Sequence, residues 1–142
     1  MFISFNASAK QVFIISFIAY LIGRLSWFSY LGNVATFAPA IIFTRLLPLV
    51  FALIIIATRR TVIKIKSWYV IFVYPVFFTA SELLLMNFSP DGTAASIAYS
   101  QTNFLPIIQI ASVTGILGIT FFVSFILSAI AVSWYYRREK QR

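Results

Sequence analysis

Three charged side chains lie inside long apolar stretches of this chain: Arg24, Arg45 and Glu82. If these stretches cross a bilayer, each ionised group costs about 2.5–3.5 kcal/mol at a helix centre, so it needs a partner or a function. At about 1.5 Å per residue, Arg24 and Glu82 both fall roughly 10 Å below the same membrane surface, and Arg45 lies deeper. We predict that Glu82 pairs with Arg24 in an intramembrane polar cluster. Arg45 or Thr79 lies near this pair, which serves either to orient helices or as the polar floor of an outward-facing cavity.

The other residue types narrow the chemistry further. The 142 residues include no Cys and no His. This excludes disulfides, thiolate metal sites and cysteine nucleophiles within the chain, and it removes the side chain that most easily serves as a general base at neutral pH. We therefore predict no metal site, no cofactor and no catalytic residue, and we expect that the chain by itself is not an enzyme.

Composition indicates a membrane protein. Hydrophobic residues make up 61% of the chain, charged residues 10%, and the mean hydropathy is +0.96, which does not suit a soluble domain. Four apolar runs, each long enough to cross a hydrocarbon core of about 30 Å as a helix, cover about residues 11–31, 34–58, 67–88 and 105–136. The first has the outline of a signal peptide but lacks an evident cleavage site, so we expect a retained helix. We predict one all-α membrane domain, residues 1–142, with four transmembrane helices.

Basic residues cluster at the ends of the apolar runs, and together with three acids they give a net charge of +8. The nine that lie outside the runs all fall on one face of the predicted membrane: Lys10, Arg59, Arg60, Lys64, Lys66, Arg137, Arg138, Lys140 and Arg142. The positive-inside rule makes this face cytoplasmic. We predict a multi-pass protein of the bacterial inner membrane, with both termini cytoplasmic and residues 89–104 periplasmic. Its partners are membrane lipids and not nucleic acid, because the bases form no exposed patch between aromatic residues.

The connection of residues 89–104 is a long polar stretch between two apolar ones. It opens with "SPDG", a turn signal in which Asp91 and Gly92 support a tight reversal. We predict that Asp91, Tyr99 and Gln101 make contacts at the periplasmic surface. The plainer alternative is a solvated connection.

Small residues recur at three- and four-residue spacing early in the fourth run. A face of this kind lets helix backbones approach closely in lipid. We predict that Ala111, Gly115 and Gly118 lie on such a packing face, in preference to contacting a ligand.

Residues 81–124, "SELLLMNFSPDGTAASIAYSQTNFLPIIQIASVTGILGITFFVS", carry an ordered set of features. These are Glu82, Gly92, Tyr99-Ser100-Gln101, Pro106, Gln109, Ala111, Gly115, Gly118 and Phe121. The stretch resembles the N-terminal membrane domain of apolipoprotein N-acyltransferases and of related membrane-anchored nitrilase-like proteins. It departs from the enzymes in lacking an aromatic residue after Gly92 and the Trp-Leu-Arg that often follows the helix acid. The chain therefore looks closer to the nitrilase-like relatives, or to a diverged copy.

The resemblance implies acyl transfer from phospholipid to lipoprotein, carried out in that family by a periplasmic nitrilase-like domain with a Glu, a Lys and a nucleophilic Cys. This chain contains no Cys, and thioester chemistry requires a thiolate. We therefore expect the catalytic domain to be absent and the chain to be the membrane half of a split or truncated protein. A separately encoded nitrilase-like domain, or a second copy of the chain, is the expected partner.

Two other functions remain open. Four helices with one embedded Glu are also typical of small exporters that work as dimers, although their essential acid lies in the first helix and Glu82 lies in the third. A structural or assembly subunit of the membrane would share nearly every feature of a non-catalytic membrane half.

Overall fold

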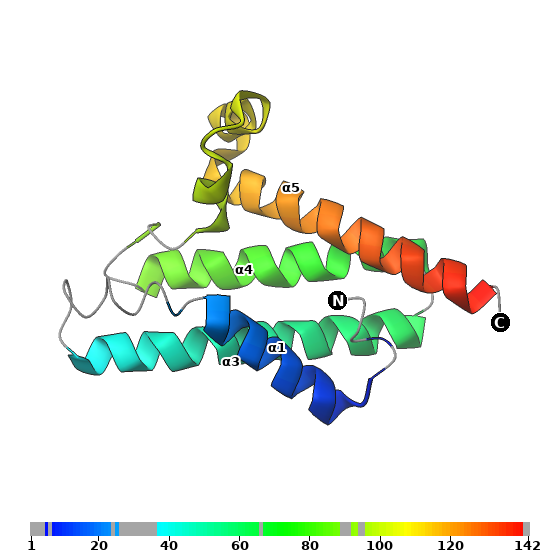
Figure 1. Ribbon diagram of the computed structural model, residues 1–142. Coiled ribbons are helices and arrows are strands. Elements are labelled where there is room, and N and C mark those ends of the chain that lie inside the picture. The colour runs from blue at the N-terminus through cyan, green and yellow to red at the C-terminus, as the bar shows by residue number, and fades with distance from the viewer. Residues whose placement is uncertain are drawn as a thin grey trace. The chain divides into compact units, whose positions relative to one another are not determined.

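The computed structural model describes residues 5, 7–23, 25, 37–65, 67–88, 92–93 and 96–140, and the regular elements among them are all helical (Figure 1). In chain order they are α1 (Ala9–Gly23), α3 (Phe37–Ile65), the 3-10 helix η2 (Trp68–Phe72), α4 (Val73–Phe88), the 3-10 helix η3 (Ile97–Gln101) and α5 (Leu105–Lys140). Within this part of the chain, three stretches are long and apolar enough to cross a membrane: Arg45–Ile65, Trp68–Phe88 and Leu105–Lys140. The shorter α1 is also apolar. The prediction of an all-α polytopic membrane protein is confirmed.

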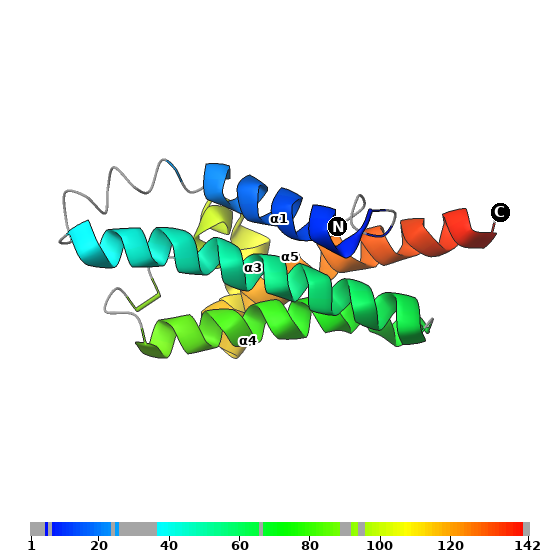
Figure 2. The ribbon, with the colours of Figure 1, turned by 90° about the horizontal axis from the view of Figure 1, so that it is seen from below.

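The chain divides into two compact units, Met1–Ile63 and Lys64–Arg142. In the first unit α1 lies beside α3 (Figure 2). The ring of Tyr20 stacks on that of Phe51, with the centroids 4.7 Å apart. Since an aromatic pair in this geometry contributes about 0.5–1.5 kcal/mol beyond its buried area, this contact holds the middle of α3 against the end of α1.

The ends of the first two helices differ from the predicted ones. α1 ends at Gly23 and Leu25 is also helical, whereas residues 24 and 26–36 lie outside the described part of the chain. α3 continues past residue 58, so the basic segment 59–65, which we predicted to be part of a connection, is helical. Its first residue is held by a contact with the start of the chain. The Arg59 guanidinium donates to the carbonyl of Ala7 over 2.8 Å.

In the second unit α4 and α5 run antiparallel and pack along their length (Figure 1). The rings of Phe72 and Phe125 stack with centroids 5.1 Å apart, and the Tyr136 hydroxyl donates to the carbonyl of Ser67 over 3.4 Å. The buried side chains of α5 are mostly small: Ile119, Thr120, Ser124, Ser128, Ala131 and Val132. Several recur every four residues, so it is this seam that gives α5 the small-residue spacing typical of close helix packing in lipid.

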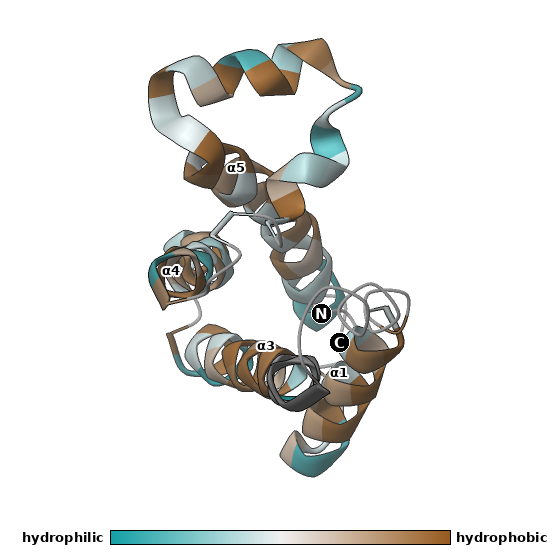
Figure 3. Cartoon of the chain, turned by 90° about the vertical axis from the view of Figure 1, so that its left-hand side faces the viewer, coloured by the Kyte–Doolittle hydropathy of each residue, from teal (hydrophilic) through white to brown (hydrophobic). Residues whose placement is uncertain are grey.

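Gly115 breaks α5 into two arms, and this corrects the predicted packing face. Its φ of 70° and ψ of −174° are not helical. The short arm, residues 105–114, therefore runs crosswise to the long arm, residues 116–140, as Figures 1 and 3 show. Ala111, Gly115 and Gly118 do not share one continuous helix, and Gly115 is a hinge residue. The spacing predicted a stripe because a glycine that breaks a helix looks the same in sequence as one that packs it.

Gly118 follows the hinge at a point of close approach. A Cβ at this position would overlap the Oγ1 and Cβ of Thr114, across the break in the helix. Gly118 is thus needed where the end of the short arm folds over the first turn of the long arm.

Candidate functional site around Glu82

Glu82 lies on α4, and its side chain is only 8% exposed. Its carboxylate accepts three hydrogen bonds. The Thr120 hydroxyl donates to Oε2 over 2.6 Å, the Ser96 hydroxyl donates to the same oxygen over 3.0 Å, and the Ile97 backbone N–H donates to Oε1 over 2.9 Å. We call Glu82, Ser96, Ile97 and Thr120 the Glu82 cluster. The cluster provides the buried acid with three neutral hydrogen-bond donors. These bonds offset the desolvation cost of placing the acid inside the protein.

Each donor reaches Glu82 from a different segment. Ser96 and Ile97 stand at the start of η3, where the Ser96 hydroxyl also accepts from the backbone N–H of Ala98 over 3.2 Å and so caps the helix. Thr120 comes from the long arm, one turn after the hinge at Gly115, and is fully buried. Glu82 therefore joins α4, the polar connection and α5 at one point.

The two hydroxyls of the cluster lie 3.3 Å apart. Each hydroxyl has a single proton to donate, and both protons are directed at the same carboxylate oxygen. The contact between the hydroxyls therefore adds no further hydrogen bond while Glu82 is ionised. With three donors from two other segments, the acid has a structural role, because these bonds hold the segments together.

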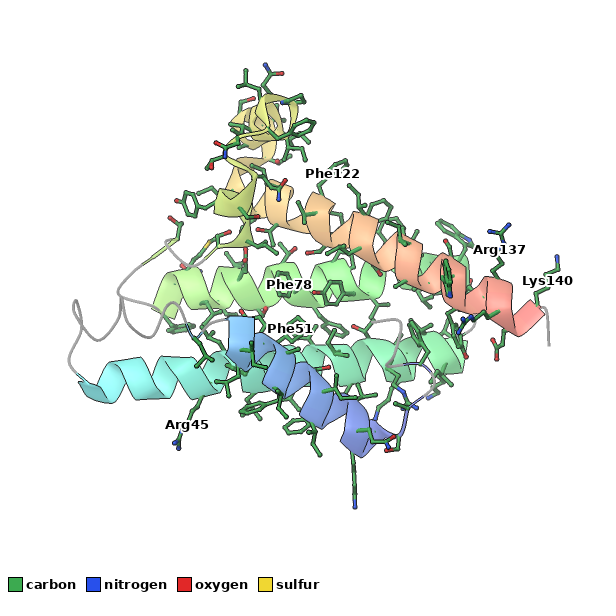
Figure 4. All side chains as sticks on the ribbon, viewed as in Figure 1. Arg45, Phe51, Phe78, Phe122, Arg137 and Lys140 are labelled. Carbon is green, nitrogen blue, oxygen red and sulfur yellow. The ribbon has the colours of Figure 1, made fainter. Side chains whose placement is uncertain are left out.

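The predicted pairing of Glu82 with arginine is not what the described residues show. Arg24 lies outside them, so an Arg24–Glu82 contact stays a prediction. Arg45 is exposed and points away from its own helix, α3 (Figure 4). Thr79 lies one turn before Glu82 on α4, and its buried hydroxyl has no hydrogen-bond partner among the described residues.

The two predicted contact residues that the structure describes, Tyr99 and Gln101, form hydrogen bonds with other residues of the same connection. Gly92 has a φ of 55°, the left-handed conformation expected of the predicted turn, whereas Asp91 lies outside the described residues. The Tyr99 hydroxyl lies 2.8 Å from the Thr93 hydroxyl, and this bond closes the loop between the turn and η3. The Gln101 amide donates to the Ser100 hydroxyl over 3.0 Å. Tyr99 remains 45% exposed, so its ring is still open to a partner.

Sequence reasoning found Glu82 but missed all three of its donors. Ser96 carried a usable signal, because a Ser just before a short apolar segment is a preferred helix N-cap. Thr120 carried none. It lies 38 residues from Glu82, and nothing in the local pattern distinguishes it from the other small residues of α5.

Replacing Thr120 by Val is expected to lower the free energy of unfolding by about 1.5–3 kcal/mol. Val has the same shape but removes a hydrogen bond to a buried charged group. The matched control is Ser124→Ala, since the Ser124 hydroxyl donates only to the carbonyl of Thr120 in its own helix over 2.7 Å. Denaturation in mixed detergent micelles, followed by circular dichroism, measures both. Equal losses in the two variants would show that the Thr120–Glu82 bond contributes no specific stability.

Comparison with known proteins gives one match. A family model described as the apolipoprotein N-acyltransferase N-terminal domain matches residues 1–129. Comparisons with curated proteins and with solved structures give no match. The family match covers most of the chain and includes every member of the Glu82 cluster.

Proposed function

The chain belongs to the family of apolipoprotein N-acyltransferase N-terminal domains, and from this we propose that it acts as a non-catalytic membrane domain in acyl transfer from phospholipid to lipoprotein. Its role is to anchor a separately encoded nitrilase-like domain and to present a lipid or lipid-bearing substrate to it. The presenting surface is the end of α4 and α5 that carries residues 96–104.

The observation that carries the proposal is the way the Glu82 cluster holds this surface. The first residues of η3 are bonded directly to an acid buried in the bundle, over 2.9 Å and 3.0 Å. Buried charge-assisted hydrogen bonds thus fix the start of η3, and a preordered surface binds with a smaller entropic cost. The exposed ring of Tyr99 stands on this ordered segment.

The proposed placement in the inner membrane, with residues 89–104 periplasmic, follows from the charged helix ends. Arg137, Arg138 and Lys140 occupy the last turn of α5, at the end far from the Glu82 cluster (Figure 4). The guanidinium of Arg138 lies over the ring of Trp134, 5.8 Å from its centroid. An aromatic residue beside basic residues is typical of the cytoplasmic membrane boundary.

Co-purification tests the proposal. The chain is tagged at its C-terminus, crosslinked in membranes of the producing organism and solubilised gently, and retained proteins are identified by mass spectrometry. We expect a nitrilase-like protein with a Glu, a Lys and a Cys in its active site, and we expect a Tyr99→Ala chain to retain less of it than a Tyr69→Ala chain. Tyr69 is the matched control because it is similarly exposed but lies in η2, far from residues 96–104 along α4. Recovery of the chain with no nitrilase-like protein would contradict the proposal, and substrate-dependent proton release in liposomes would favour an exporter.

A further inference from the structure

The short arm of α5 is not needed to cross the membrane. A straight helix of 36 residues would be about 54 Å long, far more than a hydrocarbon core of about 30 Å. The long arm alone, residues 116–140, is about 37 Å long and has its basic residues at its last turn. Because Gly115 turns the backbone before the long arm begins, residues 105–114 leave the direction of the span (Figure 3).

The two faces of the short arm differ in exposure. Ile107, Ile110 and Ala111, at the spacing of one helix face, are half-buried. The opposite face is exposed and consists of Leu105, Gln109, Ser112 and Val113. Leu105 is 69% exposed and Val113 is 87% exposed. Leu105 and Val113 flank the polar Gln109 and Ser112 on this face, and two apolar side chains so strongly exposed indicate a surface that is covered by something other than water.

The polar groups of the short arm are suited to a poorly hydrated environment. The Ser112 hydroxyl donates to the carbonyl of Gln109 over 2.7 Å, and the Thr114 hydroxyl donates to the carbonyl of Ile110 over 2.9 Å. Both hydroxyls are thus satisfied inside the helix, which removes most of their cost of transfer out of water. The Gln109 amide, on the exposed face, is the larger polar group and is suited to the hydrated headgroup level.

The lack of charged residues around this surface favours lipid over a protein partner. The chain holds no Asp, Glu, Lys or Arg between Gly92 and Tyr136, so neither the short arm nor its surroundings in sequence offer a charged rim to a protein partner. Beyond the turn at Gly115, the long arm also carries exposed apolar side chains: Phe122, Ile126, Leu127 and Ile130. In a membrane protein those side chains meet lipid.

We propose that the short arm is an interfacial helix, which lies flat at the boundary between headgroups and acyl chains of the leaflet nearest residues 89–104. Leu105 and Val113 contact the acyl chains just below the headgroups, and the side chain of Gln109, which lies between them on the same face, reaches to the hydrated headgroups. Gly115 turns the chain from the membrane plane into the span. Such helices bind the interface through their apolar face. The proposal depends on the membrane fold and not on the proposed function.

Depth measurement tests it. The chain contains no Cys, so Leu105→Cys and Val113→Cys each introduce one labelling site for an environment-sensitive fluorophore. The full chain is reconstituted in phosphatidylcholine–phosphatidylglycerol vesicles that carry a nitroxide either on the headgroup or near the end of the acyl chain. We expect both sites to be quenched most strongly by the shallow nitroxide, at equal depth within about 4 Å. The reference site, Ile126→Cys, should be quenched by the deep nitroxide, because it lies about 16 Å beyond the hinge along the long arm.

Two results would overturn the proposal. In a continuous transmembrane helix, Val113 would lie about 12 Å deeper than Leu105, because eight residues separate them. If a protein surface or water covered the short arm, neither site would be quenched by any lipid nitroxide. Phe104→Cys and Ser112→Cys, also eight residues apart and both exposed, give a second independent pair if one of the first variants does not fold.

Discussion

Replacing Glu82 by Ala lowers the free energy of unfolding by about 3–5 kcal/mol, the largest effect that we expect from any single substitution in the chain. The substitution leaves the hydroxyls of Ser96 and Thr120 and the backbone N–H of Ile97 without their acceptor. Each buried donor left unsatisfied costs about 1–3 kcal/mol, and rotation of the two hydroxyls toward other acceptors recovers part of the total. Denaturant titration in micelles, with helix content as the signal, measures the loss.

Glu82→Gln separates the charge from the hydrogen-bond geometry. Its single oxygen can accept from Ile97, but its NH₂ group then faces two hydroxyls, both of which must turn their protons away and accept instead. We expect a loss of about 1.5–3 kcal/mol, between those of Glu82→Ala and the unchanged chain. The control is Glu139→Gln, an exposed acid in the last turn of α5, for which a change within about 0.5 kcal/mol is expected. If the two Gln variants were equally stable, the Glu82 cluster would not contribute to folding.

The predicted Arg24–Glu82 pair can be measured in the same series. If Arg24 contributes, the double variant Arg24→Gln/Glu82→Gln should be less destabilised than the sum of the single variants. Additive losses would show that the three donors described above are the only significant partners of Glu82.

Gly115→Ala is expected to destabilise the chain by about 1–3 kcal/mol. The φ of 70° and ψ of −174° at this position belong to a region occupied almost only by glycine. An added Cβ would meet no atom within 4 Å, so the cost comes from the backbone conformation and not from a clash. Thermal unfolding in micelles, followed by circular dichroism, gives the change.

Gly23→Ala is the matched control for the hinge. A Cβ at Gly23 also meets nothing within 4 Å, but Gly23 has no positive φ. Because Ala is a better helix former than Gly, this control should be neutral or more stable by up to about 1 kcal/mol. Equal behaviour of the two Ala variants would mean that the chain does not turn at Gly115 in solution.

The helical fold was predictable because lipid, the solvent of the apolar runs, leaves their backbones few alternatives to a helix. Long apolar runs must be helical in lipid, and this alone placed the ends of α3, α4 and α5 within seven residues of those observed. The helix ends were less predictable, because a basic segment such as residues 59–65 can be either a loop or a continuation of the helix. Gly115 was misassigned because small residues at helical spacing indicate a packing face unless the backbone conformation is known.

The candidate site was predictable only at its centre. Glu82 is the single acid within the apolar runs, and the free-energy cost of placing an acid in the bilayer is enough to single it out. Its partners depend on how three segments come together in space, 14, 15 and 38 residues from it along the chain. Reasoning from charge favoured arginine as a partner, whereas the structure satisfies the acid with two hydroxyls and a backbone N–H.

The length of α3 has a consequence for the bilayer around it. At 29 residues it is about 44 Å long, so tilt alone would have to reach about 46° to fit it within a 30 Å core, more than transmembrane helices usually adopt. Its last seven residues, which include Arg59, Arg60 and Lys64, account for about 10 Å of the excess and are those least compatible with acyl chains. The remaining 22 residues are about 33 Å long and contain one charged residue, Arg45, whose side chain is exposed. The charged end of α3 therefore fixes how deeply the first unit sits in the bilayer. Any shift that moved Arg59, Arg60 or Lys64 into the hydrocarbon would be opposed by the cost of burying their charges.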